Sequence, residues 1–130
     1  MAGKFVHLHL HTEYSLLDGL TKTKKLTTRI KEMGMDTVAV TDHGAMYGAI
    51  EFYKQCHKDG VKPILGMEAY TCREDHKIRP EKGERFQNFH LLLLAKNEEG
   101  YKNLMKITSI AHLEGYYYRP RISNDSLCPL

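Results

Sequence analysis

Three histidines alternate with leucines near the start of the chain, and their spacing is the feature that most directly suggests chemistry. The segment is His7-Leu-His-Leu-His11. Successive side chains of a β-strand point to opposite faces, so the three imidazoles would form one row on one face. Imidazole is the commonest metal ligand among side chains, and two of them on a rigid strand lose little entropy on binding an ion. A metal site and a solvated edge strand are both open interpretations of this motif alone.

The composition is that of an ordinary globular domain, apart from its eight histidines. The 130 residues suffice for one domain with a buried core. The net charge is +3 and the basic residues are interleaved with acidic ones, so composition does not demand a nucleic-acid partner. Three cysteines without C-x-x-C spacing argue against a disulfide framework and a cysteine zinc site. Without a signal-peptide or membrane-length apolar run, we expect a cytoplasmic protein with reduced thiols.

The periodicity of apolar residues predicts strands that alternate with helices. Strands are expected at residues 5–10, 37–41, 63–71 and 89–95. Helices are expected at residues 22–33, 46–58 and 97–114, with Ile50 and Tyr53 facing inward from the second. Residues 73–88 are polar and predict an exposed loop. This order predicts an α/β fold of parallel strands joined by right-handed crossovers, either a doubly wound sheet or a barrel.

Side chains of metal-binding type follow three of the expected strands. The carboxyl ends of parallel strands meet at one rim of an α/β fold, where functional groups gather. Imidazoles mixed with carboxylates suit zinc, manganese or iron, and this many candidates favour a cluster of two or more ions. Paired ions serve the cleavage of phosphate esters. The residues placed at this rim are His9, His11, Asp18, Asp42, His43 and Glu68.

Other residues have two or more interpretations. His90 starts an expected strand rather than ending it, so the residues alone favour a core or rim histidine over a ligand. Asp42 is a metal ligand, an acceptor that orients a ligand imidazole, or a helix N-cap. Tyr116–Tyr118 with Arg119 and Arg121 could stack bases and hold phosphates. A hydrophobic anchor with solvated arginines is favoured, because stacking platforms usually need a broader basic groove. Solvated or structural roles are expected for His57, His76 and His112.

The segments His9-Leu-His-Thr12, Thr41-Asp-His-Gly44 and Gly66-Met-Glu68 resemble the opening motifs of the PHP (polymerase and histidinol phosphatase) superfamily. Longer segments, including residues 90–104 and 114–121, resemble the start of the alpha subunits of bacterial DNA polymerase III. This resemblance implies a distorted (β/α)7 barrel with a trinuclear metal site. This chain would form only part of that barrel. The ligand positions that it implies are His9, His11, Asp18, His43, Glu68 and His90, and all six hold metal-binding types here.

The resemblance also implies a function: the N-terminal metal-binding segment of a replicative DNA-directed DNA polymerase. It implies metal-dependent phosphoesterase or 3′–5′ exonuclease chemistry in the complete domain. From the mixed imidazole and carboxylate ligands we expect zinc or manganese here, and magnesium is expected for the parent polymerase. The implied partners are DNA and other replisome subunits, with no membrane, through the full-length protein.

The departures from the family pattern lead to further expectations. The polymerase palm and a later Asp-x-His motif have no counterpart, so we expect an incomplete barrel over residues 1–122 and a weakly matching tail at 123–130. Such a segment is not expected to copy DNA by itself. The alternative function is a free-standing phosphoesterase such as a histidinol phosphatase. A third hypothesis is a scaffold whose metal only stabilises the fold.

Overall fold

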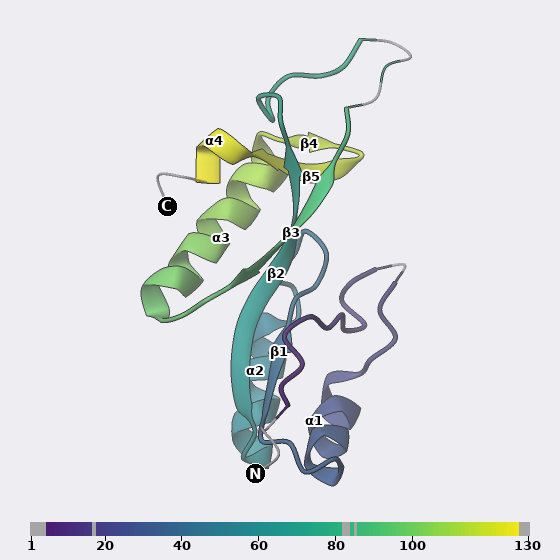
Figure 1. Cartoon of the computed structure of the whole chain (residues 1–130), viewed down its shortest axis with the longest axis vertical. Coiled ribbons are helices and arrows are strands. Elements are labelled where there is room, and N and C mark those ends of the chain that lie inside the picture. Colours follow the sequence, from purple (N-terminus) through teal and green to yellow (C-terminus); the bar gives the residue numbers. More distant parts are fainter. Residues whose placement is uncertain (1–4, 17, 82–83, 85, 128–130) are drawn as a thin grey trace.

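Four helices and five strands form along residues 5–16, 18–81, 84 and 86–127, which this computed structural model describes. In chain order they are α1 (Thr23–Glu32), β1 (Thr37–Val40), α2 (Ala49–Asp59), β2 (Lys62–Cys72), β3 (Phe89–Leu94), α3 (Glu98–Leu113), β4 (Tyr116–Tyr117), β5 (Arg119–Ser123) and α4 (Asn124–Leu127) (Figure 1). Within the described ranges, no helix combines the length and apolarity that a membrane span requires. The tail predicted at residues 123–130 contains the end of β5 and α4, and residues 128–130 lie outside the described residues.

The 11-residue strand β2 is the spine of the fold. Its first half pairs in parallel with β1. Its second half pairs antiparallel with β3 along one edge and parallel with β5 along the other (Figure 1). Alternation along the strand sends Met67 and Ala69 into the core beneath α3, so Glu68 and Tyr70 point to the opposite face. A single strand therefore carries both core residues and a candidate metal ligand.

Two hydrophobic clusters lie along β2, one against each half. The first joins α1, β1 and α2 and consists of Leu26, Ile30, Val38, Val40, Phe52, Cys56 and Val61. The second lies under α3 and consists of Met67, Ala69, Leu104, Ile107, Ala111 and Ile122. Leu65 packs against the first cluster and Met67 belongs to the second, so the clusters meet on β2 beside Glu68.

The segment that carries the first histidines is extended but is not the buried strand that we predicted. Its strand pairing is one parallel bridge, from His7 to Val38. At Leu10 the Thr41 hydroxyl adds to one backbone hydrogen bond, because it accepts from the Leu10 N–H at 2.9 Å and donates to the Leu10 carbonyl at 3.1 Å. Leu8 is 45% exposed, so the leucine side of this segment is not fully covered by the core.

Strand β3 runs antiparallel to β2, whereas the alternation of elements predicted a parallel strand. A parallel crossover needs a connection long enough to pass over the sheet, usually a helix. The described part of residues 73–88 contains no helix. The chain instead returns along β2 as a long hairpin, with Thr71 opposite Phe89 and Gly66 opposite Leu94. The first residues of β3 consequently lie beside the last residues of β2.

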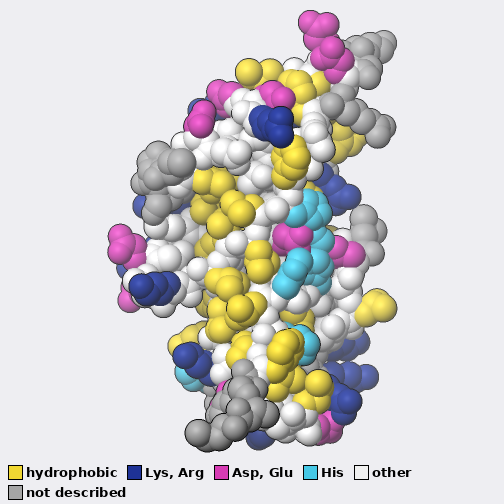
Figure 2. All heavy atoms as spheres, in the orientation of Figure 1, with side chains coloured by type: hydrophobic (Ala, Val, Ile, Leu, Met, Phe, Trp, Pro, Cys, Tyr) yellow, Lys and Arg dark blue, Asp and Glu magenta, His cyan; other side chains and the backbone are white. Residues whose placement is uncertain are grey.

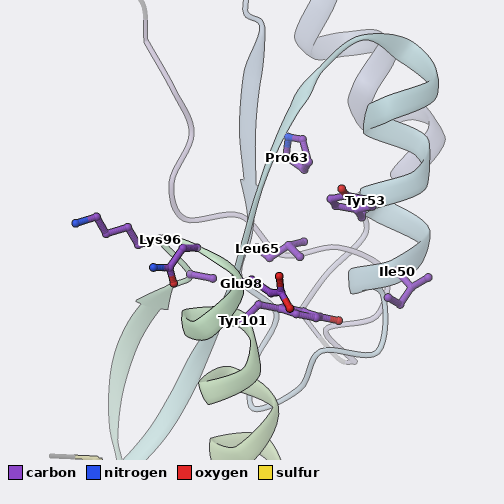
Figure 3. Close-up of a pocket in the computed structure, with 9 residues that line it drawn as sticks. Ile50, Tyr53, Pro63, Leu65, Lys96, Glu98 and Tyr101 are labelled. Carbon is purple, nitrogen blue, oxygen red and sulfur yellow. The ribbon is translucent and has the colours of Figure 1, made fainter. Parts of the chain in front are cut away.

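Helix α2 faces the core with a different side from the one predicted. Phe52 and Cys56 are fully buried, while Ile50 and Tyr53 are 56% and 45% exposed. Ile50 and Tyr53 line a surface cavity of about 520 Å³ between α2, β2 and the start of α3 (Figure 3). Ala49, Phe52 and Cys56 also have helical spacing, so the sequence contains two adjacent apolar stripes. Packing against α1 and β1 selects the stripe that contains Phe52.

Phe52→Ala is expected to lower the free energy of unfolding by about 3–5 kcal/mol, because it leaves a cavity in the first cluster. The matched change Tyr53→Ala removes a ring that is 45% exposed. That change is expected to cost about 1 kcal/mol or less. Urea unfolding followed by circular dichroism measures both values. Equal losses would show that the Tyr53 side of α2 faces the core after all.

Candidate metal centre

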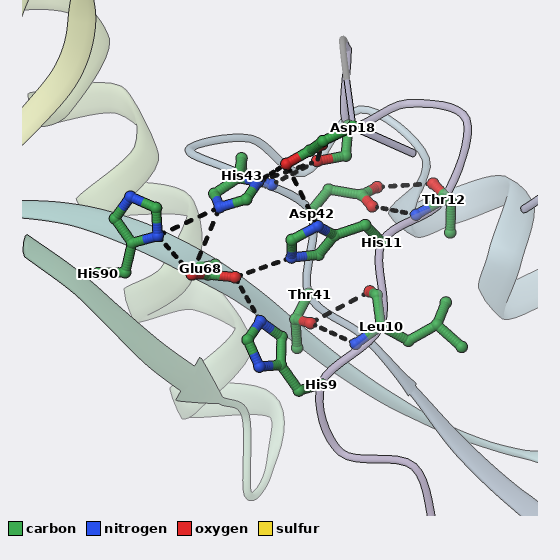
Figure 4. A network of polar contacts seen from close by, with 11 residues as sticks. His9, Leu10, His11, Thr12, Asp18, Thr41, Asp42, His43, Glu68 and His90 are labelled. Carbon is green, nitrogen blue, oxygen red and sulfur yellow. Dashed lines mark hydrogen bonds and ion pairs between the residues drawn. The ribbon is translucent and has the colours of Figure 1, made fainter. Parts of the chain in front are cut away.

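Four imidazoles surround the buried carboxylate of Glu68 in the middle of β2 (Figure 4). His11 Nε2 lies 2.7 Å from Oε2, which His9 Nε2 also contacts. His90 Nδ1 lies 2.7 Å from Oε1, and His43 Nε2 lies 3.3 Å from it. The Glu68 side chain is only 7% exposed. A carboxylate removed from water needs such partners, because burial of an unpaired charge is very costly.

Asp18 joins this group from the loop that follows the histidine segment. Its Oδ2 contacts His43 Nδ1 and lies 3.4 Å from His11 Nδ1. Ser15 connects the two sides, since its hydroxyl donates to Asp18 Oδ1 at 2.7 Å and accepts from the His43 backbone N–H at 3.0 Å. The loop between the first segment and α1 is thereby fixed to the loop after β1.

The six side chains form three overlapping groups with metal-ligand spacing. The ligand atoms within each group lie within 4.8 Å of one another. The groups are His9, His11 and Glu68; His11, Asp18 and His43; and His43, Glu68 and His90. His11 and His43 direct one ring nitrogen toward each of two groups. A neutral imidazole has one free acceptor nitrogen, so these two histidines are shared between groups rather than available to both at once.

His90 reaches the centre because β3 is antiparallel. It stands opposite Tyr70, two residues beyond Glu68 on the same face of β2. The rule that functional groups follow the carboxyl ends of parallel strands therefore misplaced His90, whereas the family resemblance included it. One sequence signal did favour this hairpin: residues 73–88 lack the apolar periodicity of the helix that a parallel crossover usually contains.

Asp42 lies beside the centre and is 2% exposed. Its two carboxylate oxygens accept from the Thr12 N–H at 2.6 Å and the Thr12 hydroxyl at 2.8 Å. We predicted a ligand, a partner of an imidazole, or a helix cap. Within the described part of the chain, its side-chain hydrogen bonds instead go to Thr12, the neighbour of His11. Burial raises the pKa of Asp42, and the bonds from Thr12 oppose that rise.

Tyr70 forms a wall of the centre that the sequence analysis missed. Its ring stacks on His43 with the centroids 5.5 Å apart and an interplanar angle of 17°. It meets the His90 ring edge-on at 5.0 Å. The signal was present, because residues two apart on a strand share a face and Tyr70 follows Glu68 by two.

Four histidines lie outside the three groups. His7 contacts Phe5 instead, with ring centroids 4.8 Å apart. His57 is exposed on α2, His76 is buried and hydrogen-bonded to the Ser123 hydroxyl, and His112 bonds the Gly44 carbonyl. The solvated or structural roles expected for the last three agree with these contacts.

Both carboxylates of the centre are ionised at neutral pH. Burial raises the pKa of Glu68, but hydrogen bonds from His9 and His11 and the charge of His43 together lower it to about 2. Burial also raises the pKa of Asp18, and the Ser15 hydrogen bond with the charge of His43 lowers it below its usual value. Metal binding requires ionised carboxylates and neutral imidazoles, so the two acids are in the required state.

Comparison with known proteins agrees with this geometry. A sequence profile of the PHP domain matches residues 7–128. The chain belongs to the PHP family. DNA polymerase III subunit alpha of Helicobacter pylori strain J99 is 58% identical to this PHP chain over 123 residues, and that of Borreliella burgdorferi is 50% identical over 125. The matches cover 95% and 96% of this chain but 10% and 11% of those proteins, so the chain spans about a tenth of their length.

Two solved structures share the fold. A Bifidobacterium adolescentis protein assigned as a metal-dependent phosphoesterase gives a TM-score of 0.54 at 20% identity, over 85% of this chain and 35% of that chain. A Chromobacterium violaceum amidohydrolase, with bound sulfate and no metal, gives 0.52 at 20% identity, over 78% and 32%. The predicted α/β class and the partial PHP-type barrel are thereby confirmed.

The stability of the metal-free protein is expected to depend on Glu68 between about pH 4.5 and about pH 2. The pKa of Glu68 falls from 4.5 to about 2 on folding. Its contribution is therefore complete above the unfolded value and is lost as the pH falls through the folded value. Glu68→Gln is expected to reduce the free energy of unfolding at about pH 5 and to reduce it progressively less toward pH 2.

Urea unfolding in EDTA at a series of pH values measures this difference. Glu32→Gln is the matched control, because Glu32 lies on α1 with a side chain that is 57% exposed. The control is expected to leave the pH dependence unchanged. A constant gap between Glu68→Gln and the wild type across the whole range would contradict the role assigned to Glu68.

Proposed function

We propose that this chain is the metal-binding PHP segment of a DNA polymerase III alpha subunit and that the complete domain hydrolyses phosphodiesters at the 3′ end of DNA. One observation carries the proposal: six side chains of metal-binding type converge in a chain that is 58% identical to such a subunit. Figure 2 shows the histidines as a patch around acidic side chains on one face. The curated relatives favour this function over a free-standing histidinol phosphatase.

The donor set fits divalent ions. Four imidazoles and two carboxylates suit zinc or manganese better than calcium. His43 Nε2 and His90 Nδ1 lie 3.3 Å apart, and both face Glu68 Oε1. Two imidazole nitrogens that converge on one carboxylate oxygen form a ready site for a cation. The three overlapping groups support the trinuclear centre that the resemblance implies.

The shared ligands leave coordination positions for substrate. We propose that His9, His11, Asp18, His43, Glu68 and His90 hold the ions. Because His11 and His43 serve two groups each, the ligand set is too small to enclose three ions completely. Bound ions would activate water near neutral pH and stabilise the negative charge of a phosphodiester.

The residues of the chain differ in what they contribute. Glu68 is buried and orients the imidazoles, while His9 and His90 have side chains that are 55% and 49% exposed. The exposed pair borders the solvent side, from which a substrate would approach. Thr12 and Asp42 hold the backbone beside His11, so that ligand keeps its position when ions exchange.

The longer protein supplies the biological setting in this proposal. We propose DNA as the substrate of a full-length alpha subunit, other replisome subunits as its partners, and magnesium as the ion of its polymerase site. The support is the identity to polymerase subunits over nearly the whole of this chain.

In the full-length gene product, the double change His9→Ala and His11→Ala is expected to lower the zinc or manganese content of this centre sharply, leaving only the group of His43, Glu68 and His90 complete. It removes two of three ligands from the first group and one from the second. Elemental analysis by mass spectrometry after dialysis measures the bound ions. His57→Ala is the matched control, since His57 is exposed on α2. Unchanged metal content in the double variant would refute the ligand assignment.

Hydrolysis of a single-stranded 3′ end by the same variant separates catalysis from structure. Loss of metal together with loss of hydrolysis supports the proposed chemistry. Loss of metal and thermal stability with normal hydrolysis would assign the ions a structural role instead.

A further inference from the structure

One arginine lies beside the metal centre with a single aromatic ring between them. The Arg119 guanidinium carbon is 5.4 Å from the centre of the Tyr70 ring, which stacks on His43. Arg119 is exposed. The ion pairs that Arg and Lys side chains form within the described ranges belong to Arg29, Lys77 and Lys102. The charge of Arg119 is thus available to an anion that reaches the centre.

The β4–β5 hairpin that carries Arg119 is packed against the loop that carries His43. A Cβ added to Gly44 would lie 2.7 Å from the Pro120 side chain and 3.1 Å from the Tyr70 ring. Gly44 also has φ +60, so a side chain there would be strained as well as crowded. This close approach fixes the hairpin relative to the metal ligands.

A cleft of about 350 Å³ opens next to Arg119. Its volume falls within the range of pockets that hold small ligands. Tyr118 lines it, is 79% exposed and has φ +57, which non-glycine residues rarely adopt. Tyr118 is the single residue that joins β4 to β5, and this tight turn holds its ring at the tip of the hairpin. The hairpin therefore presents an aromatic face on which a base can stack.

A buried cation lies behind the same cleft. Arg121 is 1% exposed, and its guanidinium lies 5.8 Å from the Phe86 ring and 5.5 Å from the Tyr117 ring, both of which line the cleft. Its Nε and Nη2 donate to backbone carbonyls, whereas Nη1 has no partner within the described ranges. With no acidic partner within the described ranges, the positive charge of Arg121 favours an anionic ligand in this cleft.

We propose that this cleft is a nucleotide subsite of the metal centre. Arg119 binds a phosphate of the substrate, and Tyr118 stacks on a base. The ligand is an unpaired 3′ end of DNA, because stacking on Tyr118 requires a base that is free of its neighbours. This assignment rests on the proposed phosphodiesterase function and specifies how that site recognises its substrate.

The assignment divides the aromatic segment into two parts. Tyr117 is partly buried, as a hydrophobic anchor would be, but Arg121 is buried and the prediction that it is solvated is wrong. Tyr118 and Arg119 face solvent and correspond to the stacking and phosphate-binding alternative. The broad basic groove that argued against stacking is unnecessary here, because the metal ions would supply much of the positive charge.

Photo-crosslinking tests the subsite without relying on catalysis. A short thymidine oligonucleotide that ends in 4-thiothymidine is irradiated with the full-length gene product, and crosslinked peptides are identified by mass spectrometry. Crosslinks are expected within residues 86–88 or 116–119, reduced by about tenfold in Arg119→Gln. Arg29→Gln, an exposed arginine on α1, is the charge-matched control and is expected to have no effect. Crosslinks confined to other peptides, or undiminished in Arg119→Gln, would overturn the proposal.

Kinetics with two chromogenic esters separate the roles of the two residues. Thymidine 5′-monophosphate p-nitrophenyl ester and methyl p-nitrophenyl phosphate share a leaving group, but only the first has a base. Arg119→Gln is expected to raise KM for both by about tenfold with kcat nearly unchanged. Tyr118→Ala is expected to raise KM by about tenfold for the thymidine ester only. Bound metal is expected to be unchanged in both variants.

The outcomes distinguish this inference from the proposed function. A lower kcat at unchanged KM, or loss of metal from Arg119→Gln, would overturn the subsite and indicate a structural role for Arg119. If the metal-loaded wild type hydrolyses neither ester but the crosslinks map to the cleft, the phosphodiesterase function fails and a nucleotide-binding site remains.

Discussion

The buried charge of Glu68 is the constraint on which the rest of this arrangement depends. A carboxylate with 7% of its side chain exposed must be compensated, and its side-chain partners within the described ranges are four imidazoles. Those imidazoles come from the first segment, the loop after β1, and β3. Each of these pieces must lie next to β2 if the charge is to be tolerated there. The Glu68 side chain thus links the arrangement of the strands to the assembly of the metal centre.

The position of Glu68 on β2 explains why the site joins two parts of the molecule. The first hydrophobic cluster holds α1, β1 and α2 together, and the second holds α3 and β5. Glu68 stands where they meet, so ligands that each cluster positions reach the same carboxylate. The clusters supply the hydrophobic stabilisation, and the polar centre adds the geometric connection between them.

The periodicity of apolar and polar residues within short segments predicted much of this fold, because it determines which side chains share a face of a helix or strand. The alternation of His9 and His11 placed both on the face that meets Glu68, even though the segment lacks a regular ladder. The direction of β3 was not predictable in this way, since it depends on how residues 73–88 return along β2. His90 therefore needed the family resemblance. On α2, two neighbouring apolar stripes had the same spacing, and only contacts with distant residues select Phe52 over Tyr53. For Asp42, the residue types alone did not reveal that Thr12 is its partner.

The sharing of His11 and His43 has a consequence for how ions enter the centre. Once an ion takes the lone pair of a shared imidazole, the neighbouring group loses a ligand and gains a nearby positive charge. If the proposed ions bind, occupancy at one position would alter affinity at the next, and loading would be a coupled, sequential process rather than three independent equilibria. A binding isotherm for such a centre is expected to show unequal steps, the last of them the weakest.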